Sequence, residues 1–502
     1  MRVAHEVTKV RAAEQSLMAQ LPPGTLMQRA AAGLASVCVG LTGGRVPGSR
    51  VVVLTGSGDN GGDALYAGAR LAGRGMAVLA VKAAAKIHEE GAAALRAAGG
   101  RLAAADDPAV PTAIGAADLI LDGLLGIGGR GGLREPQASL AGLAARSSAT
   151  VVAVDLPSGV DADTGVVAGA AIQADVTVAF GTVKPGLLVD PGATHAGVVE
   201  LIDIGLAPFL GPPDLTALQA ADVGALLGRP SAESDKYRRG VIGLVAGSQR
   251  YTGAAALAVG GALRGGAGMV RLVSAEHAVA VVRVLWPEAV ITVTGPDRPA
   301  SEDISTAGRV QAWVAGPGMG TDQDARERLA AVLASDVPVL VDADGLTLLA
   351  ADRGLLDRAA PTLLTPHAGE LGRLLGVDPA DIEARRLEHA RRAAAELGAT
   401  VLLKGSTTVI AAPGGGPVWA NLTGTSWLAT AGTGDVLSGL SGALLAQGLP
   451  VDQAAAAAAY LHGLAARLAA AGPAGGAEAP IAAGDVIGAL PDAIRSVREQ
   501  AA

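Results

Sequence analysis

Residues 51–72 read VVVLTGSGDNGGDALYAGARLA. The apolar run that opens this stretch predicts a buried strand, the glycines predict a tight turn, and the alanine-rich part from about residue 63 predicts a helix. Gly56, Gly58 and Gly61 match the spacing G-x-G-x-x-G, which lets backbone amides approach a phosphate at a helix N-terminus. A strand, a glycine-rich turn and a helix in this order indicate a doubly wound α/β fold.

The same alternation recurs along the chain, because short apolar runs are separated by helix-length segments, as in parallel sheets. A stretch rich in Pro and Gly at 205–235 is the best domain boundary. The predicted fold class is therefore α/β, with two doubly wound domains at 1–215 and 225–495. The expected strands are 51–54, 76–81, 118–121, 150–154 and 175–180 in the first domain, and 241–247, 269–274, 310–316, 337–344, 361–367 and 400–412 in the second.

Two other segments predict helices. Residues 9–40 have a helical pattern that Pro-Pro-Gly interrupts at 22–24. The six alanines at 454–459 predict a buried helix, because Ala has the highest helix propensity and Tyr460 and Leu461 extend the apolar face.

Composition excludes several classes of protein. The chain has 502 residues, 50% of them apolar, which is enough for two or three folded domains. A net charge of −8 provides no bulk positive field for nucleic acid or for an anionic membrane. Cys38 is the single cysteine, charged residues interrupt any early signal peptide, and the uncharged stretch 405–434 is too rich in Gly, Thr, Ser and Pro to span a membrane. We expect a cytoplasmic protein with small-molecule partners, no nucleic acid and no membrane.

The first glycine-rich turn lacks one feature of a redox dinucleotide site. Such a site has an acidic residue near the end of the second strand, where it binds a ribose hydroxyl, but Val81 is followed by Lys-Ala-Ala. Hydride transfer is therefore disfavoured. The turn instead carries the side-chain oxygens of Asp59, Asn60 and Asp63, which can bind a cation or hydroxyl groups.

Two further polar loops follow predicted strands of the first domain, LDGLLGIGGRGGLREP and VDLPSGVDADTG. Ligands of open α/β sheets bind at the carboxyl ends of the strands, so we expect Asp122, Asp155 and Ser158 to face the glycine-rich turn across one cleft. The alternative for each carboxylate alone is that it caps the helix or turn that follows it.

The most specific stretch of the second half is TAGTGDVLSGLSGALLAQG, a glycine-bearing turn that opens a long apolar helix. The backbone amides of Gly432 to Gly434 are expected to form an anion hole, and Asp435 to act as a base on a substrate hydroxyl. The alternative is an acidic residue that the helix dipole favours in a first turn. LLKGSTTVI at 402–410 favours a site, because it adds Lys404 and three hydroxyl residues at a strand end, and no Walker A motif competes.

Three other groups are ambiguous. Asp342 and Asp344 of VDADGL are either paired carboxylates of a site or helix caps. His367 of TPHAGE follows another strand, but a structural histidine is the favoured alternative. Three lysines, Lys184, Lys236 and Lys404, lie beside Gly or Pro in loop contexts, where a point charge suits a phosphate group.

The stretches GSGDNGGD, LDGLLGIGGRGG and VDLPSGVDADTG together resemble the NAD(P)H-hydrate epimerase family over about residues 5–210. The resemblance implies a Rossmann-like fold for this domain. It also implies that Asn60, Asp122 and Ser158 help to hold a potassium ion, and that Asp155 transfers the proton.

The same resemblance implies contacts to a damaged cofactor along these loops. Asp59 departs from the family, which usually has Asn at that position. The implied substrate contacts are Asp59, Asn60, Gly61, Gly62, Asp63, Gly126, Ile127, Gly128, Gly129, Arg130, Gly131, Gly132 and Asp155.

Six stretches of the second half look like the NAD(P)H-hydrate dehydratase family, a branch of the ribokinase-like fold, over about residues 225–490. They are DKYRRGVIGLVAGSQRYTGAAAL, AGPGMG, VDADGL, TPHAGEL, LLKGSTTVI and GTGDVLSG. The usual Gly before GTGD is Ala431, a small change that should leave the turn intact. The resemblance implies ADP as phosphoryl donor, with Mg2+ neutralising its phosphates, although the residues alone do not separate ADP from ATP. It places the nucleotide at Lys404, Gly405, Ser406, Thr407, Thr408 and Gly434, and the hydrated nicotinamide at Ala254, Gly318, His367 and Asp435.

Both resemblances imply one substrate, NADH or NADPH that has added water across the 5,6 double bond of its nicotinamide ring (NADHX or NADPHX). The expected enzyme epimerises the R and S hydrates and dehydrates the S form to NAD(P)H at the expense of ADP, giving AMP and phosphate. We also expect a homo-oligomer. Two other classes stay open: a small-molecule kinase of the ribokinase-like type with a regulatory first domain, and a non-enzymatic scaffold or dinucleotide sensor built on the first domain.

Overall fold

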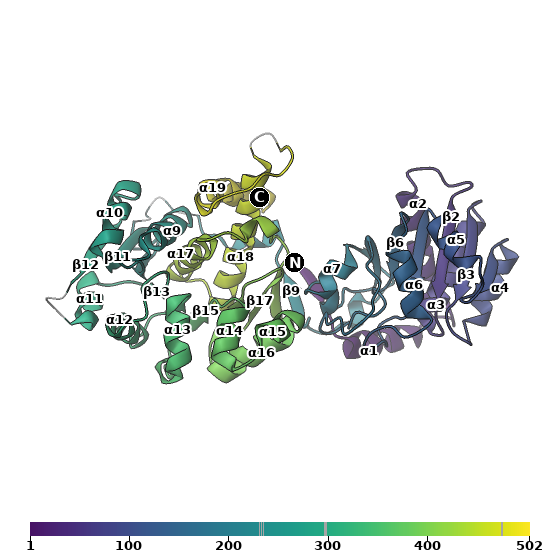
Figure 1. Cartoon of the computed structure of the whole chain (residues 1–502), viewed down its shortest axis with the longest axis horizontal. Helices are drawn as coiled ribbons and strands as arrows, with labels where there is room; N and C mark the ends of the chain where they lie inside the picture. The colour runs from purple at the N-terminus through teal and green to yellow at the C-terminus, as the bar shows by residue number, and fades with distance from the viewer. Residues whose placement is uncertain (230, 232, 234, 296–298, 473–474, 502) are drawn as a thin grey trace. The chain divides into compact units, whose positions relative to one another are not determined.

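The chain forms two compact units, each with its own β-sheet (Figure 1). The N-terminal unit comprises Val3–Leu215, and the C-terminal unit comprises Thr216–Ala502 together with Met1–Arg2. Both units combine a largely parallel sheet with helices, so the predicted α/β class is confirmed. The structure is a computed structural model that describes residues 1–229, 231, 233, 235–295, 299–472 and 475–501.

The seven strands of the N-terminal unit are all parallel, in the order β4-β3-β2-β5-β6-β7-β8. The chain starts at β2, adds β3 and β4 on one side, and returns to add the other strands on the opposite side. This reversal makes a topological switch point between β2 and β5, where ligands of such sheets bind. The elements are α1 (Val7–Met18), α2 (Thr25–Leu41), β2 (Arg50–Thr55), α3 (Asp59–Ala72), β3 (Ala77–Lys82), α4 (Glu89–Ala97), β4 (Arg101–Ala104), α5 (Val110–Gly115), β5 (Leu119–Gly123), α6 (Gln137–Ala144), β6 (Thr150–Val154), β7 (Val176–Phe180), α7 (Gly192–Ala196) and β8 (Val198–Ile202), with 3-10 turns at Pro185–Leu187 and Ala207–Phe209.

Alternate residues of the central strands enter two cores, one on each face of this sheet. Val51 and Val53 pack with apolar residues of α1, α2 and α3. Val52 and Leu54 pack with apolar residues of α5 and α6. Burial on both faces explains why β2 is an uninterrupted apolar run in the sequence.

The C-terminal sheet starts at β10 and has a second switch point, between β10 and β13. Nine of its strands lie in the order β18-β17-β16-β15-β14-β13-β10-β11-β12. The pairs from β12 to β16 are parallel, whereas β17 is antiparallel to both β16 and β18.

The bounds of the C-terminal elements are as follows. They are α8 (Ala220–Leu226), β10 (Val241–Val245), α9 (Thr252–Arg264), β11 (Met269–Ala275), α10 (Glu276–Leu285), β12 (Val290–Thr294), α11 (Ala300–Ala307), β13 (Ala312–Ala315), α12 (Gln323–Leu333), β14 (Val339–Val341), α13 (Asp344–Ala351), β15 (Thr362–Leu364), α14 (Ala368–Leu375), α15 (Pro379–Ala384), α16 (Arg386–Leu397), β16 (Thr400–Leu403), β17 (Thr408–Ala411), β18 (Val418–Asn421), α17 (Thr433–Ala446), α18 (Val451–Ala471) and α19 (Ala483–Gln500), with 3-10 turns at Arg353–Leu356 and Ser426–Leu428. Two short strands, β1 (Arg2–Ala4) and β9 (Leu215–Ala217), lie where the chain passes between the units.

Several elements differ from those that the sequence predicts. Helix α3 begins at Asp59 rather than near residue 63, so Gly61 and Gly62 lie in its first turn. Gly61 packs closely against the preceding turn there, since a Cβ would lie 2.6 Å from the Gly56 carbonyl oxygen. The expected strand at 400–412 is a hairpin of two strands, β16 and β17. Strands β4, β8 and β12 were not expected, since they lie at sheet edges and are partly exposed.

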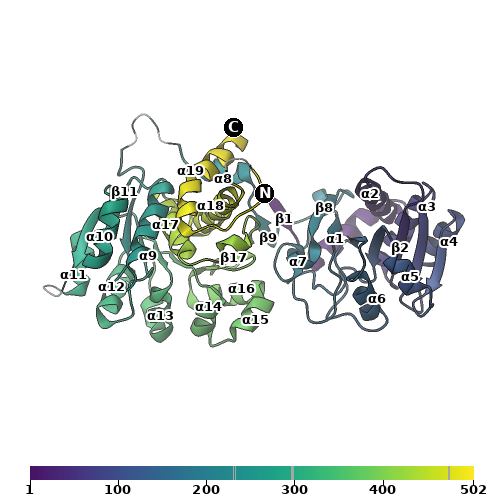
Figure 2. The same cartoon turned by 45° about the horizontal axis from the view of Figure 1, so that its top comes forward.

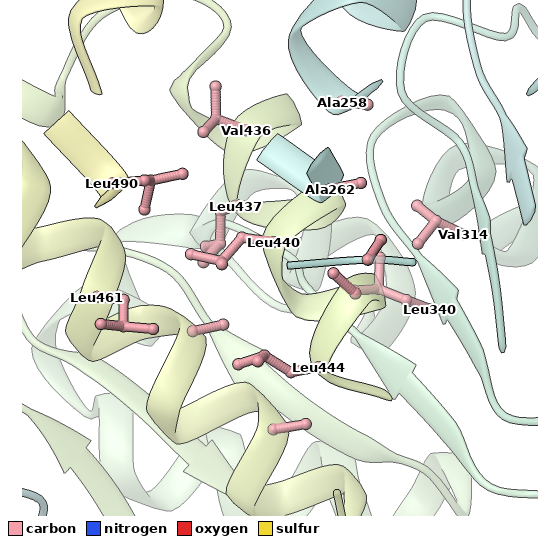
Figure 3. Close-up of a cluster of buried hydrophobic side chains, with 14 of the residues drawn as sticks. Ala258, Ala262, Val314, Leu340, Val436, Leu437, Leu440, Leu444, Leu461 and Leu490 are labelled. Carbon is pink, nitrogen blue, oxygen red and sulfur yellow. The ribbon is translucent and has the colours of Figure 1, made fainter. Parts of the chain in front are cut away.

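The core of the C-terminal unit forms around α17 (Figure 3). Leu437, Leu440 and Leu444 of this helix lie in one buried cluster with Leu461 of α18 and Leu490 of α19. Helix α18 packs against both α17 and α19 (Figure 2). By length and composition α18 is apolar enough to cross a membrane, but its six alanines are buried in this core, as the sequence predicts.

Helices α9 and α17 approach so closely that only glycine fits at their contact. A Cβ on Gly439 would overlap the carbonyl oxygen of Ala258, and a Cβ on Gly261 would overlap that of Val436. Because both obstacles are backbone atoms, a larger residue would push the helices apart.

We expect Gly439→Ala to destabilise the C-terminal unit by about 1–3 kcal/mol, because its Cβ must displace the α9 backbone. Gly488→Ala in α19 is the matched control, since a Cβ there has open space. The control should be neutral or more stable by up to about 1 kcal/mol, because alanine is the better helix former. Thermal unfolding of the two variants measures the difference, and equal midpoints would contradict the overlap.

Candidate functional site

The N-terminal site lies at the switch point, where the turn after β2 meets the loop after β5. The Gly56 N–H donates to the Gly123 carbonyl (3.0 Å), and a Cβ on Gly56 would overlap the carbonyl oxygen of Leu124. The glycine is therefore required by a close approach of two backbones.

Asp122 is the centre of a buried network beneath this contact. Its Oδ1 accepts hydrogen bonds from the Ser158 hydroxyl (2.6 Å) and from the Leu124 N–H (3.2 Å), and its Oδ2 accepts one from the Ser158 N–H (2.8 Å). Burial raises the pKa of Asp122 to about 6, although these bonds favour the ionised form and oppose the shift. Two loops therefore hold the carboxyl group in one orientation.

The backbone of Leu125 joins this network to Asn60. The Leu125 N–H donates to the Ser158 Oγ (2.8 Å), and the Leu125 carbonyl accepts from the Asn60 side-chain amide (3.0 Å). Asn60, Asp122 and Ser158 are thus brought together. The groups around Leu125 offer carboxylate, hydroxyl, amide and carbonyl oxygens, which suit a hard cation.

Asp155 is one of two non-glycine residues described with a positive φ, at 64°. Its Oδ1 accepts from the Phe180 N–H (3.0 Å) and from the ammonium group of Lys184, which also reaches the Phe180 carbonyl (3.3 Å). Lys184 is only 1% exposed. The sequence-based suggestion of a phosphate contact at Lys184 is wrong, because this ammonium is buried and paired with Asp155.

Three more carboxylates surround this pair. Burial raises the pKa of Asp63 well above its usual range, and the charges of Asp155, Asp59 and Glu14 raise it further, whereas Lys184 opposes them. The Oδ1 of Asp63 has no hydrogen-bond partner among the described residues. Sequence reasoning missed Glu14, whose pKa is also raised by burial and by Asp155.

A pocket of about 420 Å³ opens in front of these carboxylates. One wall comes from the end of α1, the Pro-Pro-Gly turn and the start of α2, none of which the sequence motifs indicate. The lining residues are Glu14, Met18, Leu21, Pro22, Pro23, Gly24, Thr25, Leu26, Met27, Gln28, Ala30, Asp59, Asp63, Tyr66, His88, Glu90, Phe180 and Ile204.

The loop after β5 lies partly apart from this pocket. Gly126 packs on Asn60, since a Cβ there would lie 3.0 Å from the Asn60 Cβ, and Gly132 packs on the backbone of Gly169. Gly131 adopts a positive φ of 74°. A separate hollow of about 100 Å³ is lined by Ile127, Gly128, Gly129 and Arg130, with Val7, Arg11, Asp161, Ala162 and Asp163.

In the C-terminal unit, Lys404 lies at the end of β16 among carboxylates. Its Nζ donates to Asp342 Oδ1 (2.7 Å) and lies 3.8 Å from Glu370 Oε2. Asp342 Oδ2 accepts from the Ser438 hydroxyl of α17 (2.6 Å). Burial alone would lower the pKa of Lys404, but Asp342, Glu370 and Asp435 together raise it, so the ammonium stays charged.

Asp435 lies in the first turn of α17, which begins after Gly432 with a φ of 89°. Burial raises the pKa of Asp435 to about 7; Asp342 and Asp344 add to the shift and Lys404 opposes it. A carboxylate with this pKa can accept a proton near neutral pH.

A pocket of about 810 Å³ lies beside these residues. Of the residues assigned to nucleotide, Lys404, Gly405, Ser406, Thr408 and Gly434 line it, and so does His367. The remaining assigned residues, Thr407, Asp435, Ala254 and Gly318, lie outside this lining. Ala254 and Gly318 adjoin each other, since a Cβ on Gly318 would lie 2.8 Å from that of Ala254. The other lining residues are Glu383, Asn421, Gly424, Thr425, Ser426, Leu428, Ala429, Thr430, Ala431, Thr433, Leu437, Ala459 and His462.

The structure decides between the alternatives for His367, Asp342 and Asp344. His367 caps α14, because its Nδ1 accepts from the N–H groups of Gly369 (3.0 Å) and Glu370 (3.3 Å). The cap interpretation is wrong for the two aspartates. Asp342 holds Lys404, Asp344 Oδ2 accepts from the Gly320 N–H (2.9 Å), and neither caps α13.

Two further residues of this site carry no signal in the sequence. Arg386 is fully buried and donates from Nε to the Thr407 carbonyl (3.1 Å) and from Nη2 to the Lys404 carbonyl (2.6 Å), so it shapes the turn after β16. In the sequence, Arg386 lies within EARRLEHARR, a run of charged residues that is typical of a solvent-exposed helix face, so its burial is not indicated. His462 lies inside the polyalanine helix α18, where burial lowers its pKa to about 4.

Comparison with known families matches both halves of the chain. Residues 242–486 match the family described as NAD(P)H-hydrate dehydratase, and residues 23–186 match the family described as YjeF-related protein N-terminus. The crystal structure of the ADP/ATP-dependent NAD(P)H-hydrate dehydratase from Bacillus subtilis, co-crystallised with ATP/Mg2+, has a TM-score of 0.50 at 31% identity and covers 57% of this chain and 99% of that chain. A ribokinase-like superfamily protein from Enterococcus faecalis also has a TM-score of 0.50, at 25% identity, and covers 57% of this chain and 98% of that chain.

Relatives that match the full chain combine both parts. The bifunctional NAD(P)H-hydrate repair enzyme Nnr of Mycobacterium leprae is 46% identical over 99% of this chain and 100% of that protein. The enzyme of the same name from Mycobacterium tuberculosis is 47% identical over 91% of this chain and 92% of that protein. The predicted resemblance is confirmed, and the chain belongs to the family of bifunctional NAD(P)H-hydrate repair enzymes.

Proposed function

We propose that the two activities of this repair enzyme are divided between the two units. As a member of its family, the chain epimerises the hydrates of NADH and NADPH and dehydrates the S form. We assign the epimerase to residues 1–215 and the dehydratase to residues 225–495. The observation that carries the assignment is that each unit has its own lysine–aspartate pair at the carboxyl end of its sheet, with the lysine largely or fully removed from solvent.

Epimerisation must break and remake a bond at C6, which carries a hydroxyl group beside the ring nitrogen. Protonated hydroxyl leaves C6 as water while the nitrogen lone pair forms an iminium; water then adds to the opposite face and loses a proton. We assign the proton transfer to Asp155, which Lys184 orients and stabilises as the carboxylate. Asp63, whose pKa is raised by burial and by Asp155, Asp59 and Glu14, lines the neighbouring pocket and is a second candidate for this proton transfer.

The residues around Asp122 fit a potassium ion. Asn60, Asp122 and Ser158 offer oxygen atoms, and their hydrogen bonds through Leu125 hold them together. Among the residues described, no group of three or more His, Cys, Asp or Glu side chains is arranged to hold a metal ion. A monovalent cation bound mainly by neutral oxygens agrees with this arrangement. Such an ion would supply positive charge close to the bound cofactor.

Dehydration needs a better leaving group than hydroxide, and phosphorylation of the C6 hydroxyl provides one. We propose that Asp435 takes the hydroxyl proton while ADP transfers its terminal phosphoryl group to that oxygen, leaving AMP. Phosphate then leaves C6, a proton leaves C5, and the 5,6 double bond returns. The amides of Gly432 to Gly434 and Lys404 are the donors that face the phosphates.

We propose that Mg2+ reaches this site with the nucleotide, as the Bacillus subtilis relative was crystallised with ATP/Mg2+. Mg2+ commonly binds one or two carboxylates together with substrate phosphates, which needs no cage made by protein alone. Asp342 and Asp344 are the carboxylates whose charges raise the pKa of Asp435, and they fit this role. ADP as the donor, a homo-oligomeric state and a cytoplasmic location stay predictions; the buried, free Cys38 agrees with a reducing compartment.

We expect Asp435→Asn to slow dehydration of the S hydrate by about 100- to 10,000-fold, because the variant keeps the shape but loses the base. Recovery of reduced-nicotinamide absorbance with ADP and Mg2+ measures the rate, and the exposed Asp336→Asn is the control. A kinase would instead accumulate phosphorylated alcohol. A near-normal rate in Asp435→Asn would contradict the assignment.

The pH profile tests the same residue independently. Since the pKa of Asp435 is raised to about 7, the base is protonated below that pH and ionised above it. The dehydration rate should therefore rise with pH through about 7 and level off above it. The residual rate of Asp435→Asn should lack this rise, and an unchanged profile would assign the titration to another group.

We expect epimerisation to require potassium and to fall when tetramethylammonium replaces it, because the larger ion does not fit among Asn60, Asp122 and Ser158. Asp122→Asn should need a higher potassium concentration for half-maximal rate, with ADP-dependent dehydration of pure S hydrate unchanged as the internal control. Epimerisation that is indifferent to the cation in both proteins would disprove the site.

We expect Asp155→Asn to slow epimerisation of purified R hydrate by about 100-fold or more, since a positioned proton-transferring group is lost. Initial rates must be used, because spontaneous epimerisation blurs the end point. Dehydration of pure S hydrate should be unaffected, and Asp435→Asn should show the converse. If a folded Asp155→Asn protein that still binds ADP fails to turn over S hydrate, the sites are not independent.

A further inference from the structure

A third cavity, of about 460 Å³, lies in the C-terminal unit away from the nucleotide pocket. Its lining includes residues just before β10 and just after α9 and α17, so it lies at the amino ends of the strands. Lys404 and Gly434, by contrast, lie at their carboxyl ends. Six arginines line this cavity, which we call the arginine pocket: Arg229, Arg238, Arg239, Arg264, Arg495 and Arg498.

Most of this positive charge has no carboxylate to balance it. No acidic residue lines the pocket. Arg238 lies 3.8 Å from Glu233, and Arg495 is paired with Asp492. Within the part of the chain that the structure describes, the other four arginines have no salt bridge to a carboxylate. The charge of this pocket is therefore positive, although the chain as a whole has a net charge of −8.

The negative C-terminal ends of three helices offset part of this positive charge. The C-cap residues of α8, α9 and α17, which are Leu227, Gly265 and Gln447, all line the pocket. Each helix C-terminus carries roughly half a negative charge, so three of them offset about one and a half of the four unpaired positive charges. About two and a half positive charges are left without a counter-charge, which is comparable in size with the negative charge of a diphosphate group.

The donors of these arginines are largely unused by the protein. Arg239 donates one hydrogen bond to the Gly266 carbonyl (3.2 Å), and Arg498 donates one to the Gly228 carbonyl (2.9 Å). The Nε of Arg498 is buried and has no hydrogen-bond partner among the described residues. A guanidinium has five N–H donors, so both side chains are anchored and still have donors to offer.

We propose that the arginine pocket binds a small molecule that carries two or more linked phosphate groups. Arginine forks match phosphate oxygens in pairs, and the pocket volume lies in the range of about 300–1,000 Å³ of small-molecule sites. Leu227, Leu263 and Ile494 provide an apolar wall that suits an organic moiety attached to the phosphates. A site of this kind is distinct from the nucleotide pocket and extends the proposed function to a second anion site.

The test is a calorimetric titration of the full chain with inorganic tripolyphosphate without Mg2+. The first variant is Arg239→Gln with Arg498→Gln. The second is Arg229→Gln with Arg264→Gln, which removes charge without touching the hydrogen bonds that Arg239 and Arg498 donate to the Gly266 and Gly228 carbonyls. Arg283→Gln is the control, because it removes one exposed arginine of the same unit that lies outside the pocket. Dehydration of S hydrate reports that each variant is folded.

We expect two tripolyphosphate sites in the natural protein, one at the nucleotide pocket and one at the arginine pocket. Each double variant should weaken the second site at least tenfold and leave the first unchanged, whereas Arg283→Gln should change neither by more than twofold. A single site that both double variants retain would overturn the proposal. So would a 20-nucleotide single strand that binds the same arginines more tightly than tripolyphosphate, since the surface would then serve nucleic acid.

Discussion

Each site of this protein depends on one buried ammonium group among several carboxylates. Lys184 holds Asp155, and Lys404 holds Asp342, in both cases where a parallel strand ends. Removing carboxylates from water is costly unless a counter-charge is close, so neither cluster would persist without its lysine. Burial raises the pKa values of the remaining carboxyl groups, Asp63 and Asp435, and neighbouring carboxylates that one lysine cannot neutralise raise them further. The pKa of Asp435 is raised to about 7, so this group can exchange protons near neutral pH.

The backbone also adopts rare positive φ angles in the loops at these strand ends. Asp155 and Ala343 are the two non-glycine residues described with positive φ, and they lie in the loops that carry the aspartates of the two lysine–aspartate pairs. Strained backbone of this kind persists where the surroundings hold it, which is common at functional sites. Gly56 also helps to assemble the N-terminal site, because its lack of a side chain allows the turn after β2 to contact the loop after β5.

The order of the strands explains why these loops meet. Each sheet begins in its middle, at β2 or β10, and reverses direction at a switch point beside that strand. Loops that are far apart in sequence therefore meet at the carboxyl ends of the strands, where the proposed cofactor and nucleotide sites lie. The arginine pocket lies at the opposite, amino ends of the strands of the C-terminal sheet, where helices α8, α9 and α17 end.

The amino-acid sequence alone was enough to predict the α/β class, two units and the loops that carry the chemistry, because strand and helix periods and glycine spacings are local properties of the chain. It led to errors where a contact decided the outcome: the start of α3, the hairpin of β16 and β17 and the burial of Lys184. For Asp342 it left two alternatives open, and the contact with Lys404 decides between them. Glu14, Arg386 and His462 carry no local signal at all. Their roles come from partners that the fold brings close from far along the chain, and burial by those partners, rather than residue type, sets their charge and their hydrogen bonds.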